Sequence, residues 1–224
     1  MSYILLLLPG IFTFILTGIL RSFFIKQKIF VDSPNDRSSH KEDLVRAGGI
    51  SVVTTFILSI FFFHLFSFIT FSNLAPLIFS ILLISIIGLI DDHSGLKASL
   101  RLFFQFLIST FLMIFLLEEG SLFAISGITE NFTTIGSIFT IIYIVWLINL
   151  FNFMDGINGI VSLEAISTSL AVFLILYLTN TEYSFSILYL VFAICLVGFL
   201  PWNFPIAKIF MGDCCAYFIG LIVC

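Results

Sequence analysis

Charge is scarce in this sequence, and its scarcity excludes several classes of protein. Charged residues make up 10% of the chain, and the nine basic residues form no stripe of the kind that binds nucleic acid. The three histidines and four cysteines show neither zinc-ligand spacing nor a disulfide framework. In their place, 60% of the residues are hydrophobic and 30 are Phe. A soluble domain could not bury that much apolar surface, so the sequence predicts a protein of the lipid bilayer.

Long apolar runs predict the fold class. Seven runs are long enough to cross about 30 Å of hydrocarbon, and an eighth begins near Met211. We therefore predict an all-α, polytopic membrane protein, with residues 1–224 as a single transmembrane domain. The seven expected spans are residues 3–25, 48–71, 74–91, 99–117, 135–153, 159–179 and 184–202.

The basic residues predict the orientation of these spans. If the spans alternate, all nine fall on one side of the membrane: Arg21, Lys26, Lys28, Arg37, Lys41, Arg46, Lys97, Arg101 and Lys208. The connections on the other side, near residues 72–73, 118–134 and 180–183, contain no Lys or Arg. By the positive-inside rule the basic side is cytoplasmic, which leaves the N-terminus periplasmic. The polar motifs described below then all lie at cytoplasmic ends of spans.

The most unusual stretch runs from Asn149 to Gly159, where amides and a carboxylate interrupt an apolar run. Asn149, Asn152 and Asp155 are three residues apart, so on a helix they share one face. One interpretation is a helix end whose polar side chains and glycines satisfy the last carbonyls. The density of polar residues favours the other interpretation, a functional site.

Two further segments carry carboxylates to the same side. Asp91 and Asp92 end the third span, and adjacent carboxylates are normally held together by cations or a metal. Arg101 follows and can reach the interface or a phosphate. Near the end of the chain, prolines and Gly212 break the helix and direct Asn203 and Asp213 toward the same region. Oxygen ligands of this kind suit Mg²⁺, whose coordination shell is usually completed by substrate phosphates.

The first cytoplasmic loop is the most polar part of the chain. It contains Arg37, His40 and Arg46, which are candidates to clamp a phosphorylated substrate. The alternative is a juxtamembrane basic segment that sets orientation and touches anionic lipid.

Taken together, these residues resemble a known family. The motifs are Asp91-Asp92, Asn149-x-x-Asn152-x-x-Asp155-Gly, Asn203 ten residues before Asp213, and Phe210-Met-Gly-Asp213. They resemble the polyprenyl-phosphate N-acetylhexosamine-1-phosphate transferases, or glycosyltransferase family 4, over nearly the whole chain. The loop from Pro34 to His40 with Arg46-Ala-Gly-Gly resembles the branch that initiates O-antigen synthesis.

The resemblance implies transfer of a sugar-1-phosphate from a UDP-N-acetylhexosamine to undecaprenyl phosphate, with release of UMP at the cytoplasmic face of a bacterial inner membrane. It implies Mg²⁺, with Mn²⁺ as an alternative, and is compatible with a homodimer. Asp213 matches the family's metal-ligand aspartate, with Asn152 as a second metal-side residue. The residues implied as catalytic are Asp91, Asp92 and Asp213, and those implied as substrate-binding are Arg37, His40, Arg46, Arg101, Asn149, Asn152, Asp155 and Asn203.

The sequence departs from the family pattern in two places. Cys214-Cys215-Ala216 follows Asp213 where many relatives carry a small residue, Gly and Ser. The chain also ends eleven residues after Asp213, and from this we expect a truncated chain with little transferase activity. A membrane transporter with a cytoplasmic cation site is the alternative function; it predicts carboxylates near the midplane and an inverted repeat, and the sequence shows neither. A non-catalytic scaffold would leave the clustered Asn and Asp unexplained.

Overall fold

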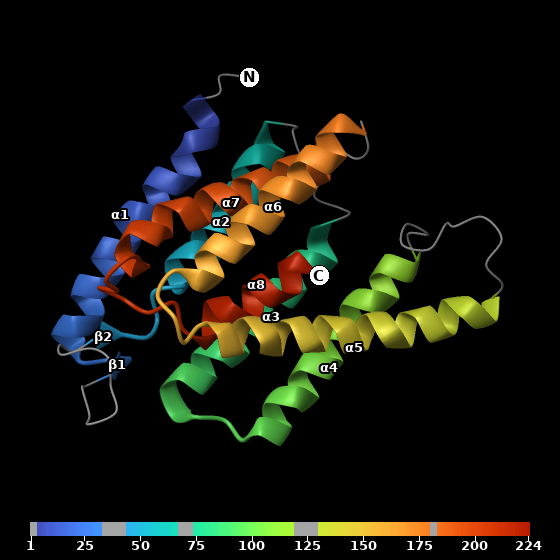
Figure 1. Cartoon of the computed structure of the whole chain (residues 1–224), viewed down its shortest axis with the longest axis horizontal. Coiled ribbons are helices and arrows are strands. Elements are labelled where there is room, and N and C mark those ends of the chain that lie inside the picture. The colour runs from blue at the N-terminus through green and yellow to red at the C-terminus, as the bar shows by residue number, and fades with distance from the viewer. Residues whose placement is uncertain (1–3, 33–43, 67–73, 119–129, 180–182) are drawn as a thin grey trace.

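The computed structural model of the chain describes residues 4–32, 44–66, 74–118, 130–179 and 183–224. These residues form a helical bundle with one very small sheet (Figure 1). The helices are α1 (Ile4–Gln27), α2 (Ile50–Leu65), α3 (Ala75–Ser94), α4 (Ala98–Glu118), α5 (Glu130–Met154), α6 (Ile160–Leu178), α7 (Tyr183–Asn203) and α8 (Asp213–Val223).

Each of the seven expected apolar runs corresponds to one helix, α1 to α7, and the eighth run corresponds to α8. Among the described residues, six helices are long and apolar enough to cross a membrane, whereas α2 with 16 residues and α8 with 11 are shorter. The fold is therefore that of a polytopic helical membrane protein. A count of seven full spans and a periplasmic N-terminus remain predictions.

The polar first loop contains the one departure from an all-helical chain within the described ranges. Strand β1 (Val31–Asp32) pairs antiparallel with β2 (Leu44–Val45), Val31 opposite Val45. Strands of two residues are too short to leave a pattern in the sequence, so the pair was not predicted. Phe210 donates its N–H to the Val45 carbonyl, 2.8 Å away. The first loop is thereby tied to the segment that precedes α8.

Helix α8 lies at the centre of the bundle (Figure 1) and contacts α2, α3, α5 and α6. All nine residues from Cys214 to Ile222 are buried. Two glycines in neighbouring helices make this packing close. A Cβ on Gly88 of α3 would lie 2.5 Å from the Cα of Cys214, and one on Gly220 of α8 would lie 2.5 Å from the Cα of Ile148. Both distances are shorter than any ordinary contact, so the backbones meet only because neither position carries a side chain.

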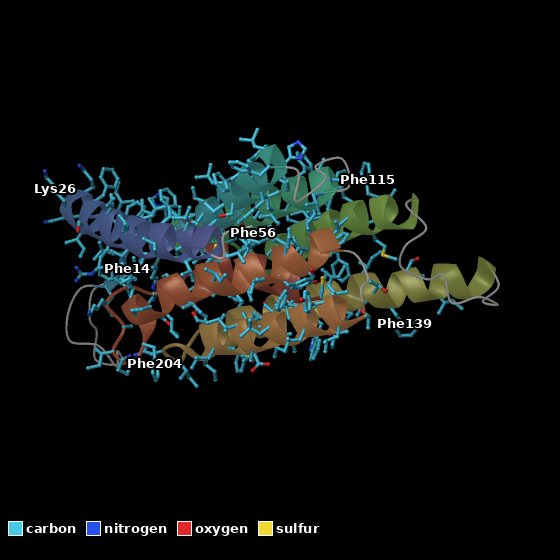
Figure 2. All side chains as sticks on the ribbon, turned by 90° about the horizontal axis from the view of Figure 1, so that it is seen from above. Phe14, Lys26, Phe56, Phe115, Phe139 and Phe204 are labelled. Carbon is cyan, nitrogen blue, oxygen red and sulfur yellow. The ribbon has the colours of Figure 1, made fainter. Side chains whose placement is uncertain are left out.

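The outside of the bundle is apolar, as a bilayer requires. On α1 the side chains of Leu7, Ile11, Ile15 and Ile19 form a stripe at four-residue spacing, each more than half exposed (52–59%). Figure 2 shows carbon-rich side chains, including the labelled Phe14 and Phe139, projecting from the outer helices, while Phe56 lies inside. The labelled Lys26 and Phe204 lie at one end of the bundle.

Candidate active site

Side chains from four helices and one connection meet at this end of the bundle. Asp91 and Asp92 lie in the last turn of α3 and Arg101 in the first turn of α4. Asn152 and Asp155 lie at the end of α5 and just after it, and Asp213 is the first residue of α8. Antiparallel helices joined by short connections put these ends together, as the alternation of spans predicted. The Asp-Asp pair, the Asn-Asp stretch and Asp213 therefore form one cluster.

Asp91 connects three elements through its carboxylate. Its Oδ1 accepts the Leu96 N–H at 2.7 Å. Its Oδ2 accepts the Tyr217 hydroxyl at 2.6 Å and an Arg101 N–H at 3.0 Å. The Asp91 side chain is only 4% exposed, so the Arg101 cation compensates a buried charge. The expected cation beside the carboxylate pair is therefore present for Asp91, which Arg101 contacts.

Asp92 faces the start of α8 instead. Its Oδ1 accepts the Asp213 N–H at 2.9 Å, and its Oδ2 accepts the Cys214 N–H at 3.2 Å. The first N–H groups of a helix have no partner within the helix, and they favour a negative charge. Asp92 therefore caps α8 from a different helix.

Asn152 and Asp155 lie on the other side of Asp213. The Asn152 side-chain amide donates a hydrogen bond to Oδ1 of Asp213, and Oδ2 of Asp155 accepts the Gly212 N–H at 3.2 Å. The pKa of Asp155 is raised to about 8, mainly by burial and also by the charges of Asp213 and Asp92, while the hydrogen bond from the Gly212 N–H acts in the opposite direction. A divalent cation bound here would reverse this effect and hold the carboxylate ionised.

Gly212 is required where α8 begins. Its φ of 82° lies in the left-handed region that favours glycine. A Cβ at this position would also collide with the carbonyl oxygen of Arg46. The close approach of the segment before α2 thus fixes the backbone just before Asp213.

Two of the predicted substrate-binding residues use their amides inside the protein. Asn149 donates hydrogen bonds to Gln105 of α4 at 2.6 Å and to the Val145 carbonyl at 2.7 Å. The buried Asn203 accepts the Gly159 N–H at 2.7 Å and donates to the Ile209 carbonyl at 3.1 Å. Within the described residues, the contacts to the α8 segment come from Asn152 and Asp155, and those of Asn149 are to Gln105 and Val145. Substrate contacts by Asn149 and Asn203 stay predictions.

The predicted basic clamp is described only in part. Arg46 forms an exposed ion pair with Asp32, 2.7 Å between Nη2 and Oδ2. Its backbone adjoins Gly212, which places it next to the cluster. Arg37 and His40 lie outside the described residues, so their proposed role in binding phosphate stays a prediction.

The fit of the site to a divalent metal follows from its donors. Among the described residues, no group of three or more His, Cys, Asp or Glu side chains could hold a metal ion. Mg²⁺ does not need such a cage, because it keeps waters and is usually bound by one or two carboxylates and substrate phosphates. Asp213 and Asp155 supply hard oxygen donors on either side of Gly212. Their chemistry fits a metal that arrives with a phosphorylated substrate.

Sequence reasoning missed two residues of the site. Tyr217 is buried and donates its hydroxyl to Asp91. The available signal was its spacing, since it follows Asp213 by four residues and so lies on the same helical face. Gly88, one turn before Asp92, lets α3 approach Asp213 and Cys214 closely. A glycine in a hydrophobic run gave no indication of which helix it faces.

The site and the helical bundle that holds it together define a class of membrane protein. The model of glycosyl transferase family 4 matches residues 74–224, and the chain belongs to that family. The match begins just before α3 and includes every carboxylate of the cluster.

Two curated relatives extend the similarity to the N-terminal helices. The chain is 28% identical over 211 residues to undecaprenyl-phosphate alpha-N-acetylglucosaminyl 1-phosphate transferase of Thermotoga maritima, covering 94% of this chain and 60% of that protein. It is 27% identical over 230 residues to phospho-N-acetylmuramoyl-pentapeptide-transferase of a Wolbachia species, covering 93% of this chain and 69% of that protein. The chain thus spans well under the full length of the relatives it resembles.

Proposed function

We propose that this protein transfers N-acetylhexosamine-1-phosphate from a UDP-sugar to undecaprenyl phosphate and releases UMP. The observation that carries the proposal is the meeting of Asp213 and Asp155 at the start of α8, with the Arg101 cation held nearby by Asp91. Carboxylates at a helix break suit a metal-bound pyrophosphate, and a cation suits a lipid phosphate. Both relatives bear names of 1-phosphate or phospho-sugar transferases, which supports the same reaction class.

The proposed reaction does not need a strong general base. An oxygen of the acceptor phosphate, already ionised at neutral pH, attacks the phosphorus that bears the sugar. The new phosphorus–oxygen bond forms as the bond to the bridging oxygen breaks, and UMP leaves with that electron pair. Negative charge on the leaving group must be neutralised, so positioning and electrostatic stabilisation supply most of the catalysis.

The proposed cofactor is Mg²⁺, with Mn²⁺ as a substitute. Asp213 would hold the metal, with the Asn152 amide fixing one Asp213 oxygen and Asp155 facing it across Gly212. When bound, the metal would neutralise charge on the pyrophosphate. The protein's own contribution is to present Asp213 in one orientation.

The position of the carboxylates argues against the transporter alternative. Asp91, Asp92, Asp155 and Asp213 lie at helix ends, whereas a transporter's coupling-ion site is expected near the bilayer midplane. No observation on the described residues favours a cation pathway over a phosphate site.

The direct test is a UMP-release assay in lipid nanodiscs, with undecaprenyl phosphate and a panel of UDP-N-acetylhexosamines, on a version of the protein that spans the full length of its relatives. We expect release with at least one of these sugars that requires both Mg²⁺ and the lipid phosphate. UDP-glucose, which lacks the N-acetyl group, is the matched control. Hydrolysis of the UDP-sugar at the same rate without lipid phosphate would contradict a transferase.

The proposal includes a cytoplasmic active site in the bacterial inner membrane and a role at the first membrane step of O-antigen-like polysaccharide synthesis. The one-sided Lys and Arg distribution supports the orientation. In a cysteine-free background, Ser94→Cys should be protected from an impermeant thiol reagent in spheroplasts, whereas Glu130→Cys should react. Labelling of Ser94→Cys from outside would show that the orientation is opposite to the proposed one.

A further inference from the structure

We propose that Asp92 is a positioning residue: its carboxylate caps α8 and thereby orients Asp213, without touching substrate or metal itself. This inference rests on the proposed function for the role of Asp213. It assigns different tasks to two neighbouring aspartates that the sequence treats as one pair.

The cap is defined by two hydrogen bonds. Asp92 accepts the N–H of Asp213 at 2.9 Å and that of Cys214 at 3.2 Å, one with each carboxylate oxygen. The residue that precedes α8 is Gly212, which has no side chain and makes no side-chain cap. Helix ends without a cap leave these N–H groups unpaired, which is costly for a helix as buried as α8. Asp92 supplies both missing acceptors from α3.

A second contact holds the same two helices one turn further along. The Tyr217 hydroxyl donates to Asp91 at 2.6 Å, and Asp91 is in turn paired with Arg101. The last turn of α3 therefore contacts α8 at two points, the first N–H groups of α8 and the Tyr217 hydroxyl. Asp213 belongs to the first of these contacts through its own N–H, so its side chain reaches Asn152 from a backbone position that Asp92 holds.

The alternative is that Asp92 contacts the metal or a phosphate directly. Its geometry favours the cap, because both of its oxygens accept backbone N–H groups from the first turn of α8. Asp155 differs, since only its Oδ2 has a hydrogen bond within the described residues. Removing a cap should disturb the first turn of α8, whereas removing a ligand should abolish metal binding and leave that turn intact.

The four cysteines allow a direct measurement of the cap. Selective ¹⁵N-cysteine labelling gives one amide signal each for Cys195, Cys214, Cys215 and Cys224, and the Cys214 amide is the one bonded to Asp92. In Asp92→Ala we expect the Cys214 signal to shift and its hydrogen exchange to accelerate about 5-fold or more, the size expected for losing a cap. Asp92→Asn keeps one acceptor oxygen and should give an intermediate change. The Cys195 and Cys224 signals should not move.

The second readout is Mn²⁺ affinity in the presence of UDP-sugar, followed by electron paramagnetic resonance. Asp92→Ala should weaken Mn²⁺ binding several-fold but leave it saturable, and Asp92→Asn should recover part of the loss. Asp213→Asn should remove specific binding. Tyr217→Phe should weaken it less than Asp92→Ala, because Asp91 keeps Arg101 and the Leu96 N–H.

Tyr189→Phe is the matched control. Tyr189 also donates its hydroxyl to α8, but at the Ile222 carbonyl near the far end of the helix, 3.2 Å away. Its loss should leave both Mn²⁺ affinity and the Cys214 signal unchanged. An unchanged Cys214 signal in Asp92→Ala would overturn the proposal, as would loss of Mn²⁺ binding in Asp92→Asn equal to that in Asp213→Asn. Neither readout needs turnover, so absence of UMP release would contradict the transferase and leave the positioning role supported by the Cys214 response.

Discussion

Helices α1 and α8 are both almost entirely apolar, yet they occupy opposite environments. Helix α1 has 24 residues and exposes a row of large side chains, with Ile19 59% exposed. Helix α8 has 11 residues and buries nine consecutive ones. Lipid tails are as apolar as leucine, so the exposed stripe of α1 gains nothing from a protein partner. The burial of α8 depends on close contact, hydrogen bonds and two glycines.

The comparison shows where this protein is sensitive to substitution. In α1 a missing side chain is replaced by lipid, whereas in α8 nothing can fill the space. Asp213, whose carboxylate is proposed to hold the metal, is the first residue of α8. Of the two helices compared, α8 is the one in which we expect substitutions to cost more. Rigid packing along α8 therefore fixes the geometry of the site.

The largest difference is expected for matched phenylalanines. Phe218 of α8 is fully buried against Phe56 and Phe192, whereas Phe12 of α1 is 46% exposed. Phe218→Ala should lower the free energy of unfolding by about 3 kcal/mol, largely through the cavity it leaves. Phe12→Ala should change the free energy of unfolding by less than about 0.5 kcal/mol. Unfolding titrations in mixed micelles would measure both, and equal losses would contradict the comparison.

A smaller difference is expected for matched glycines. A Cβ on Gly88 would meet backbone atoms of Asp213 and Cys214, whereas one on Gly18 of α1 would meet side-chain atoms of the Trp202 ring. Gly88→Ala should cost about 1–3 kcal/mol of stability through overpacking, with Gly18→Ala below that range. Because Gly88→Ala pushes on Asp213 directly, it should also weaken Mn²⁺ binding. If Gly88→Ala lowers stability but binds Mn²⁺ normally, then packing at Gly88 does not control the geometry of the metal site.

The smallest effect is expected for the exposed ion pair just after α1. Asp32 and Arg46 are 23% and 54% exposed at their side chains. Asp32→Asn should lower the free energy of unfolding by no more than about 1 kcal/mol, and by less at high salt. Thermal unfolding at two ionic strengths would show this. A larger, salt-independent loss would place the pair in the structural core instead of at the surface.

The sequence predicted the helices because length and hydropathy are sufficient to mark a membrane helix. It predicted that Asp91, Asp92, Asp155 and Asp213 would meet because alternating spans put their ends on one side. It did not predict that α8 is central, since hydropathy cannot distinguish a face toward lipid from a face toward protein. The division of tasks between Asp91 and Asp92 depends on rotation about the α3 axis, which the sequence does not specify. The inward direction of Asn149 and Asn203 was likewise set by backbone and Gln105 contacts that only the fold creates.

The central claim is that Asp213 holds the metal at the start of α8, and a Mg²⁺ titration of UMP release by a version of the protein that spans the full length of its relatives tests it most directly. Asp213→Asn preserves the side-chain volume and the cap from Asp92, because that cap is made to backbone N–H groups. We expect this variant to lose about 100-fold or more in turnover, the size expected for losing charge stabilisation in a transition state. It should also require far more Mg²⁺, whereas Asp92→Asn should lower turnover with a smaller change in the Mg²⁺ requirement. An unchanged Mg²⁺ titration in Asp213→Asn, together with a strong shift in Asp92→Asn, would assign the metal to the Asp-Asp pair and contradict the account.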